Sequence, residues 1–336
     1  MRIAVAISGG VDSSVCAKLL LEEGHEVVLC HFLMSDKGEA AVPDAKRVAE
    51  FFGLPFVLKD LRSAFEERVV APFIREYLNA RTPNPCVLCN PTFKFRELIA
   101  AADEAGCELA ATGHYAVVRD GRLFEAKDLK KDQSYFLARL SHEQLKRIVF
   151  PLGGFSKPEV REIAKAAGIP VAEKHDSQEI CFIPGDDYEA FLKTRAPEAF
   201  SPGEIVDTEG RAVGEHVGLP AYTIGQRKKI GAHCERKYVV KIDKENNRVT
   251  IGGNEDLARK EVLLEDVSFI LPAAEKTFRA AAKIRSTSPP KPCLVSVLER
   301  GRASLVFDEP ERAVTPGQTG VIYLSGEVLG AGTITD

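Results

Sequence analysis

The first half of the chain alternates short apolar runs with stretches whose apolar residues recur at helical spacing. The apolar runs predict buried strands at RIAVAI (2–7), EVVLCHFL (26–33), PFVLKD (55–60) and ELAAT (108–112). The helical patterns cover residues 13–23, a segment with Ala45, Val48, Ala49 and Phe52 on one face, and a segment after Pro91 with Phe95, Leu98, Ile99 and Ala102. Strands and helices that alternate in this way predict βαβ units and a parallel sheet.

Two further helices are predicted from capping boxes, in which a hydroxyl residue precedes a glutamate or glutamine by three positions. Ser141 and Gln144 stand before LKRIV, and Ser156 and Glu159 stand before VREIAKAAG. Each pair can satisfy the free N–H groups at a helix start.

After about residue 200 the pattern changes to short alternating runs separated by turns such as DTEG, DKENN and ERGR. The runs are EIVD, KYVVKID, RVTIG, CLVSVLE, ASLVFD and GVIYL, and together they predict an all-β second half. The segment LPAAEK (271–276) reads as a domain boundary within this half. We therefore expect three domains, over residues 1–198, 199–270 and 271–336.

Composition and charge fit this division. A chain of 336 residues is too long for one ordinary core, and its formal net charge is −4. Binding to nucleic acid therefore requires a local basic patch, and residues 222–241 provide one. Six cations lie there against the single acid Glu235, namely Arg227, Lys228, Lys229, Arg236, Lys237 and Lys241. A phosphate contact and a merely solvated face are both open readings of this segment.

The sequence also predicts the cellular location of the protein. No leader pattern and no apolar run of membrane-spanning length is found, and the eight cysteines have no regular spacing. These features predict a cytoplasmic protein with reduced thiols and no membrane partner. Five cysteines are expected to be small buried hydrophobes, namely Cys16, Cys30, Cys107, Cys234 and Cys293.

The strand 2–7 runs directly into SGGVDSSV (8–15), which opens a helix and is called the phosphate loop below. Gly9 and Gly10 allow the backbone to approach an anion, and the helix N-terminus favours negative charge. Ser8, Ser13 and Ser14 add hydroxyls, and Asp12 is a candidate Mg²⁺ ligand. The loop is neither a Walker A loop nor G-x-G-x-x-G. A plain Gly-Gly turn with an ordinary helix cap is the competing reading.

Two cysteines stand three positions apart in TPNPCVLCN (82–90), between prolines. We expect Asn90 to cap a helix that starts at Pro91, so that the helix N-terminus, Lys94 and Arg96 lower the pKa of Cys89. Cys89 is then a candidate nucleophile. Cys181 lies in HDSQEICFIPGDDY (175–188), a polar loop setting. No second cysteine pair completes a zinc site, but an iron–sulfur cluster on Cys86, Cys89 and Cys181 stays open.

The phosphate loop resembles that of the PP-loop ATP pyrophosphatases, whose mark is SGGxDS after the first strand. Six further motifs in order resemble the tRNA-specific 2-thiouridylase family: TPNPCVLCN, ATGHY (111–115), KDQSYFL (131–137), SQEICFI (177–183), GLPAYTIGQRKKIG (218–231) and AVTPGQ (313–318). The resemblance implies an N-terminal doubly wound parallel sheet of PP-loop type followed by two small β-rich domains, the last a β-barrel. It also implies sulfur transfer to the wobble uridine, position 34, of certain tRNAs.

By match to the family's motifs, each group of site residues has an implied role. Cys89 is the nucleophile, Cys181 carries a persulfide, and Cys86 is a possible third thiol. ATP is expected to contact Ala6, Ile7, Ser8, Gly9, Gly10, Val11, Asp12, Ser13, Leu33 and Gly113. The target base and the tRNA are expected to contact Asn84, Pro85, Cys86, Lys131, Asp132, Gln133, Arg285 and Ser286, together with Arg227 and Lys228 of the basic segment.

The implied chemistry uses ATP and Mg²⁺ to adenylate O2 of the uracil, because this oxygen is a poor leaving group. Cys89 then attacks the persulfide on Cys181, which releases sulfide and leaves a Cys89–Cys181 disulfide. The implied partners are tRNA and a persulfide donor protein, such as a cysteine desulfurase or a relay protein. His114 either touches phosphate or makes a structural hydrogen bond.

The sequence departs from the family pattern at four places. Cys86 replaces a common aspartate, Pro91 replaces a common lysine, the loop 36–43 is short and the segment 231–238 is contracted. Two readings outside thiolation also stay open, a PP-loop amide ligase and an RNA-binding module with a metal clip. An inert Cys89→Ser change would favour the first, and absence of pyrophosphate release would favour the second.

Overall fold

The N-terminal domain is built on a five-stranded parallel sheet. The computed structural model describes residues 1–175 and 180–335, and its first sheet has the strand order β3-β2-β1-β4-β7. The strands are β1 (Arg2–Ala6), β2 (Glu26–Leu33), β3 (Phe56–Asp60), β4 (Leu109–Ala111) and β7 (Ile148–Val149). Every neighbouring pair in this sheet is parallel. The order turns around at β1 and β4, where the phosphate loop leaves the sheet.

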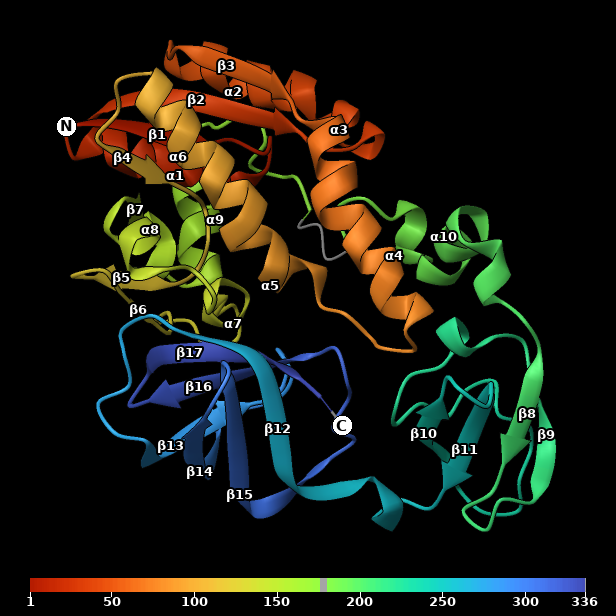
Figure 1. The fold of residues 1–336 in the computed structure, drawn as a ribbon. Helices are drawn as coiled ribbons and strands as arrows, with labels where there is room; N and C mark the ends of the chain where they lie inside the picture. The colour runs from red at the N-terminus through yellow and green to blue at the C-terminus, as the bar shows by residue number, and fades with distance from the viewer. Residues whose placement is uncertain (176–179, 336) are drawn as a thin grey trace.

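Helices cover both faces of this sheet, as a doubly wound fold requires (Figure 1). Ile3 and Val5 of β1 pack with the helices of one face, and Ala4 packs with those of the other. The longer helices are α1 (Val11–Glu22), α2 (Val42–Phe52), α4 (Ala71–Leu78), α6 (Phe95–Glu104), α9 (Lys157–Ala166) and α10 (Tyr188–Arg195). The shorter ones are α3 (Arg62–Phe65), α5 (Pro85–Cys89), α7 (Ser134–Leu137) and α8 (His142–Lys146). The predicted α/β architecture is confirmed.

Both predicted capping boxes are present. The Ser141 hydroxyl accepts a hydrogen bond from Gln144 N (3.2 Å), and Gln144 Oε1 accepts one from Ser141 N (3.1 Å). At the start of α9, Glu159 Oε2 accepts from Ser156 N at 2.6 Å. These contacts fix the starts of α8 and α9, and the start of α9 carries Lys157 toward the phosphate loop.

The helix that follows the paired cysteines begins earlier than the sequence predicts. α5 starts at Pro85 and runs through the π-helical turn η3 (Asn90–Lys94) into α6 without a break. Pro91 has no N–H to donate to the preceding turn, so the helix widens there instead of ending. The expected helix start at Pro91 is therefore wrong, and Cys89 lies inside a helix.

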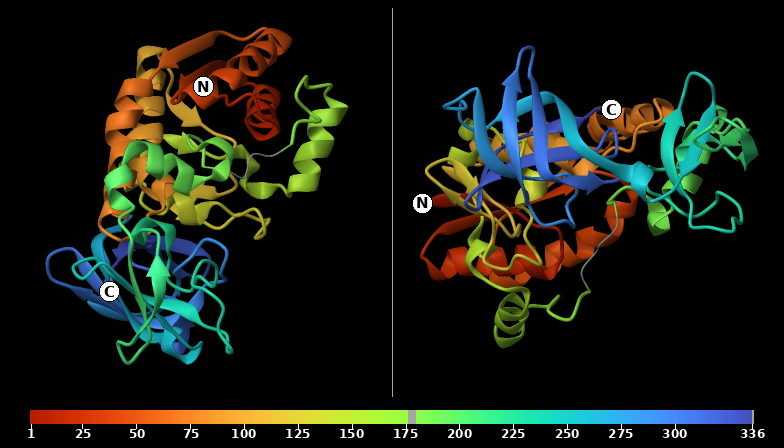
Figure 2. Two further views of the ribbon diagram at one scale, coloured as in Figure 1. Left: turned by 90° about the vertical axis from the view of Figure 1, so that its right-hand side faces the viewer. Right: turned by 90° about the horizontal axis from the view of Figure 1, so that it is seen from below.

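The second half is all-β, as predicted. A four-stranded central sheet has the order β10-β11-β8-β9, with the strands β8 (Gly203–Val206), β9 (Ala212–His216), β10 (Tyr238–Asp243) and β11 (Arg248–Gly252). The last six strands form an antiparallel barrel that closes through the β12–β17 pairing. They are β12 (Ala258–Phe269), β13 (Thr277–Lys283), β14 (Lys291–Leu298), β15 (Arg302–Arg312), β16 (Thr319–Leu324) and β17 (Glu327–Ile334). Barrel and central sheet lie side by side below the N-terminal domain (Figure 2).

The strand β12 lies before the boundary expected at residue 271, and it pairs with β15 and β17. The segment LPAAEK (271–276) is thus the connection between two barrel strands. A hairpin of the N-terminal domain also joins the barrel sheet: β6 (Arg122–Phe124) pairs with β17 and with β5 (Val117–Arg119). We propose that the barrel domain starts at β12, and the other limits stay predictions.

Candidate functional site

The phosphate loop forms a tight turn at the end of β1. The Ser13 hydroxyl donates to the carbonyl oxygen of Gly10 (3.1 Å), and Ser8 N donates to Ser13 Oγ (3.2 Å). Ser14 Oγ donates to the same carbonyl at 2.8 Å. These bonds fix the first turn of α1, whose residues Asp12 and Ser13 line a cavity.

Two glycines are required by close backbone packing. A side chain on Gly9, whose φ is +71°, would lie 2.8 Å from the carbonyl oxygen of Ala41. A side chain on Gly113 would lie 2.7 Å from Ser13 N. Because Gly113 has no side chain, the loop after β4 can pack directly against the backbone of the phosphate loop.

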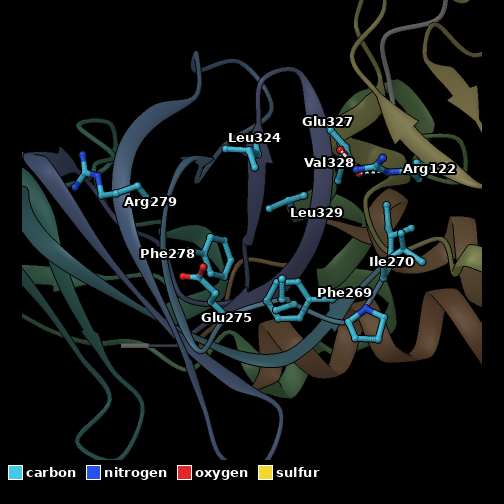
Figure 3. Close-up of a pocket in the computed structure, with 14 residues that line it drawn as sticks. Arg122, Phe269, Ile270, Glu275, Phe278, Arg279, Leu324, Glu327, Val328 and Leu329 are labelled. Carbon is cyan, nitrogen blue, oxygen red and sulfur yellow. Dashed lines mark hydrogen bonds and ion pairs between the residues drawn. The ribbon is translucent and has the colours of Figure 1, made fainter.

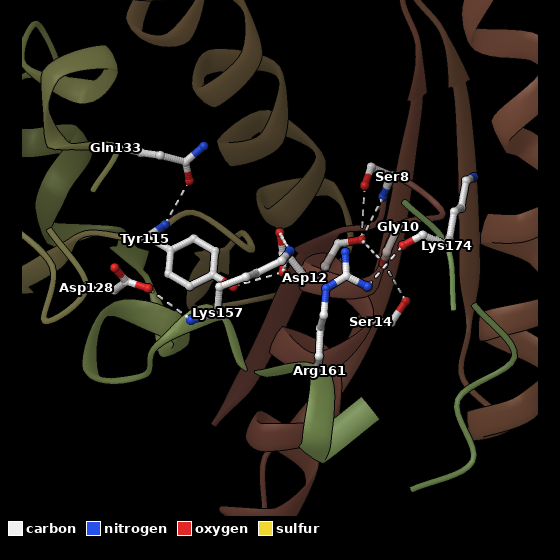
Figure 4. Close-up of polar contacts among 11 residues, drawn as sticks. Ser8, Gly10, Asp12, Ser14, Tyr115, Asp128, Gln133, Lys157, Arg161 and Lys174 are labelled. Atoms are coloured by element: carbon white, nitrogen blue, oxygen red, sulfur yellow. Dashed lines mark hydrogen bonds and ion pairs between the residues drawn. The ribbon is translucent and has the colours of Figure 1, made fainter. Parts of the chain in front are cut away.

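Asp12 is held by two residues from outside the phosphate loop (Figure 4). Lys157 Nζ donates to both carboxylate oxygens, at 2.7 and 2.8 Å, and the Tyr115 hydroxyl donates to Oδ1 at 2.9 Å. The Lys157 side chain is only 9% exposed. A Mg²⁺ ion on Asp12 would have to compete with this ion pair, so the geometry does not present Asp12 as an open metal ligand.

The phosphate loop is also held from the segment before Cys181. Lys174 Nζ donates to the carbonyl oxygen of Gly9 (3.0 Å) and to Asp44 Oδ2 (2.6 Å). Arg161 Nη1 donates to the backbone carbonyl of Lys174 at 3.3 Å. Residues 177–179 of the SQEICFI motif lie outside the described residues.

A cavity of about 450 Å³ opens between the phosphate loop and the thiol region. Of the residues expected to contact ATP, its lining includes Ala6, Ile7, Ser8, Asp12, Ser13 and Gly113. Gly9, Gly10, Val11 and Leu33 are not part of the lining. Neighbours on a strand point to opposite faces, so Phe32 and Met34 line the cavity where Leu33 was expected. Cys181 and Lys94 complete the wall on the thiol side.

Of the three candidate thiol residues, Cys181 belongs to the lining of this cavity, and Cys86 and Cys89 do not. Cys89 is buried, Cys86 is half-buried and Cys181 is an exposed residue whose thiol lines the cavity. All eight cysteines are free thiols, and Cys234, expected to be buried, is exposed. In the described part of the chain no three His, Cys, Asp or Glu side chains are arranged to hold a metal ion.

Burial dominates the acidity of these thiols. It raises the pKa of Cys89 to about 12, and it raises the pKa of Cys86 and of Cys181 as well. Lys94 opposes this rise at all three sulfurs. The expected lowering of the Cys89 pKa by a helix N-terminus is wrong, because Cys89 lies inside the helix.

Lys94 and His114 face the same cavity with different charge states. The Lys94 side chain has no carboxylate partner among residues 1–175 and 180–335, so its charge is available to an anion. Burial, helped by Lys94, lowers the pKa of His114 to about 3, and the ring is neutral. His114 Nδ1 shares a 2.7 Å hydrogen bond with Thr112 Oγ1. This favours the structural reading of His114 over a charged phosphate contact.

Comparison with known proteins covers the chain from end to end. Residues 1–185 match the family described as tRNA methyl transferase HUP domain, residues 189–253 its PRC-barrel domain, and residues 259–334 an aminomethyltransferase β-barrel domain. The tRNA-specific 2-thiouridylase MnmA of Geobacter metallireducens is 46% identical over 354 residues, which cover 99% of this chain and 96% of that protein. The protein of that name from Pelobacter propionicus is 46% identical over 347 residues, covering 100% and 98%.

This chain belongs to the tRNA-specific 2-thiouridylase family. The family expected from the motifs is thereby confirmed. Among solved structures, a U34-tRNA thiolase NcsA from Methanococcus maripaludis with its [4Fe-4S] cluster shares 17% identity at a TM-score of 0.38, over 59% of this chain and 66% of that one. That likeness is too weak to bear on the cofactor of this family member.

The residues expected to contact tRNA in this 2-thiouridylase differ in how far they are exposed. Ser286, Arg227 and Lys228 are exposed, and Asn84, Lys131, Gln133 and Arg285 are half-buried. Pro85 is buried, and the side chain of Asp132 is only 2% exposed. The Asp132 carboxylate accepts from the Ser134 hydroxyl and lies 3.7 Å from Lys283 Nζ of the barrel, so this side chain offers little surface to a tRNA. Arg285 also has a structural contact, donating to the carbonyl of Arg312 at 3.1 Å.

A second cavity of the 2-thiouridylase, about 360 Å³, lies on the barrel beside the β5–β6 hairpin (Figure 3). Phe269, Phe278 and Leu329 line it, and an Arg122–Glu327 ion pair stands at its edge. Its lining holds neither a thiol nor a phosphate-loop residue. Within the described residues, no helix is both long and apolar enough to cross a membrane.

Lys157 and Tyr115 are the site residues that the sequence reading missed. Lys157 follows the N-cap Ser156, so the capping box located its helix without indicating its partner. Tyr115 lies in the ATGHY motif, but nothing in the local pattern indicates that its hydroxyl reaches Asp12. Both contacts join segments that are more than a hundred residues apart from Asp12 in the chain.

Proposed function

We propose that this protein makes 2-thiouridine at the wobble position of tRNA, with ATP as the activating substrate. The observation that carries the proposal is the shared cavity: phosphate-loop residues line one side, and Cys181 with Lys94 lines the other. An adenylated oxygen and an attacking sulfur must meet within one small volume. The names and full-length similarity of the relatives support the substrate class.

The first step is activation of the base. O2 of the uracil attacks the α-phosphorus of ATP, and pyrophosphate leaves. The α1 N-terminus and the Ser8 and Ser13 hydroxyls are suited to bind the departing phosphates. Lys157, which is paired with Asp12 beside the loop, is the cation suited to bind phosphate, and Asp12 would hold Mg²⁺ only once that pair opened. Magnesium bound there would neutralise phosphate charge.

The second step is sulfur transfer. The Cys89 thiolate attacks the inner sulfur of a persulfide on Cys181, which forms a Cys89–Cys181 disulfide and releases hydrosulfide. Hydrosulfide attacks C2, and AMP leaves with the former O2. A thiol reductant then restores both cysteines, and a persulfide donor protein reloads Cys181. Lys94 favours the anionic sulfur that burial alone disfavours.

The second candidate is thiolation through an iron–sulfur cluster. Negative charge on Cys86 or on Cys181 raises the pKa of Cys89, which requires the sulfurs to lie near one another. The three thiols are therefore close neighbours and are the residues that would hold an iron–sulfur cluster. A cluster would supply an open iron to bind the sulfur atom. Within residues 1–175 and 180–335, however, the three thiols are not arranged to hold a metal ion.

The test is tRNA thiolation by single Cys→Ser variants, purified without oxygen, with iron content recorded. Cys89→Ser and Cys181→Ser are expected to lose roughly a thousandfold or more, as replaced nucleophiles do. Cys86→Ser should keep activity within about tenfold, and Cys234→Ser, exposed and away from the cavity lining, is the matched control. Joint loss of iron and activity in Cys86→Ser would establish the cluster route, and full activity in Cys89→Ser would refute both routes.

A further inference from the structure

Lys283 is a buried cation at the junction of the barrel and the N-terminal domain. It is the last residue of β13, and its side chain is 9% exposed. Its Nζ lies 3.2 Å from Glu125 Oε1, 3.7 Å from Asp132 Oδ2 and 5.0 Å from the centre of the Tyr323 ring. Buried charges persist only when they are paired, so these partners fix its position.

Asp132 carries this contact into the N-terminal domain. Its Oδ1 accepts from Ala126 N (3.0 Å) and Ser134 N (3.2 Å), and its Oδ2 accepts from Ser134 Oγ (2.7 Å). These bonds tie together the two ends of residues 125–134, called the bridge loop below. Lys283 therefore holds the whole loop through one carboxylate at each end.

The bridge loop also contacts both residues that hold Asp12 (Figure 4). Gln133 N donates to the Tyr115 carbonyl at 2.8 Å, and Gln133 Oε1 accepts from Tyr115 N at 2.9 Å. Asp128 Oδ2 accepts from Lys157 N at 3.1 Å. A continuous set of contacts thus joins the barrel to the phosphate loop.

We propose that Lys283 is a positioning residue for the phosphate loop. By holding the bridge loop, it sets Tyr115 and Lys157 against Asp12, so that ATP turnover depends on the barrel. This inference rests on the proposed function, in which ATP reacts at the phosphate loop. Lys283 lies two residues before Arg285 at the same strand end. The tRNA contact predicted at Arg285 and Ser286 would therefore affect the position of Lys283 and, through it, the bridge loop.

The test measures AMP formation from ATP in the full-length protein, with tRNA and sulfide supplied. Lys283→Met keeps the length of the side chain and removes its charge. We expect kcat to fall about tenfold, since small displacements of catalytic groups have effects of this size. The KM for tRNA should stay within about twofold. Lys283→Arg should recover most of the activity, and Lys276→Met, an exposed lysine of the same barrel, should behave as wild type.

A double-mutant cycle with Tyr115→Phe separates positioning from general damage. If Lys283 acts through the bridge loop, the two changes together should reduce kcat by much less than the product of their separate effects. Multiplicative effects, an unchanged kcat in folded Lys283→Met, or no recovery in Lys283→Arg would each overturn the inference. If Lys283→Met does not fold, the double variant Lys283→Met with Glu125→Gln is measured instead. It removes the Glu125 charge that the single change leaves buried without its partner. A wild type that forms no AMP refutes the proposed function itself.

Discussion

At the scale of single residues, the acidity of the thiols is set by burial and by one cation. The sequence identified Cys86, Cys89, Cys181 and Lys94 as neighbours in motif or in charge. It could not give the sign of the Cys89 pKa shift, because that depends on how deeply the packed chain encloses the sulfur. The neutral state of His114 has the same origin.

The first residue-scale prediction concerns His114. Its folded-state pKa, about 3, lies below the ordinary value of 6.5, so the unfolded chain binds the extra proton first. The stability due to neutral His114 is therefore complete above about pH 6.5 and is lost as the pH falls toward 3, by at most about 1.4 kcal/mol per pH unit. Urea unfolding at several pH values checks this.

The comparison variant is His114→Gln, which cannot take up a proton. The unfolding free energy of wild type minus that of the variant should fall as the pH drops below about 6. The exposed His175 is the control, and His175→Gln should not reproduce this trend. A difference that does not change with pH would contradict a depressed His114 pKa.

At the scale of elements, hydrophobic periodicity was sufficient for most of the fold. Strand β2 and strand β11 match their predicted bounds residue for residue, and α2 ends before Gly53, whose φ is +65°. The helix across Pro91 was missed, because a proline ordinarily marks a helix start or a break. Strands β12 and β17 were missed too, although β17 forms a hairpin with β16, which directly precedes it.

The element-scale prediction concerns Pro91→Ala. Alanine restores the missing N–H, so the π-helical turn between Cys89 and Phe95 can tighten to an α-helix. Such a change would turn Cys89 relative to Lys94, and thiolation should fall several-fold while the thermal midpoint is kept or raised. Pro72→Ala is the control, because Pro72 lies just after another π-helical turn, Glu66–Val70, and not inside it. Unchanged thiolation with altered helix content would show that the turn does not matter.

At the scale of the whole molecule, the fold class and family were predictable because several motifs in order specify them. The contacts among domains were not. Asp132 was expected to contact tRNA, yet its carboxylate faces Lys283 of the barrel, and no local pattern records a contact with another domain. The cations of the basic segment also differ in a way that the sequence does not reveal. Arg227 and Lys228 are exposed and can contact a phosphate, whereas Lys229 is paired with Glu189.

The whole-molecule prediction is charge reversal in that segment. Arg227→Glu with Lys228→Glu should weaken tRNA binding and reduce the slope of log Kd against log salt by about two, one for each phosphate that the protein no longer neutralises. Filter binding across a salt series measures both. Lys46→Glu with Lys165→Glu makes the same change in net charge on the outer helices of the N-terminal domain. Equal behaviour of the two double variants would make the segment a solvated face.

The β5–β6 hairpin has a consequence for how the chain is made. Leu123 of β6 pairs with Val328 of β17, which the ribosome adds about two hundred residues later. At ordinary elongation rates the edge of β6 then stays without its partner for roughly ten to forty seconds. An open strand edge can pair with another nascent chain during that interval. The hairpin that joins the N-terminal domain to the barrel is thus also a point at which the growing chain is exposed to aggregation.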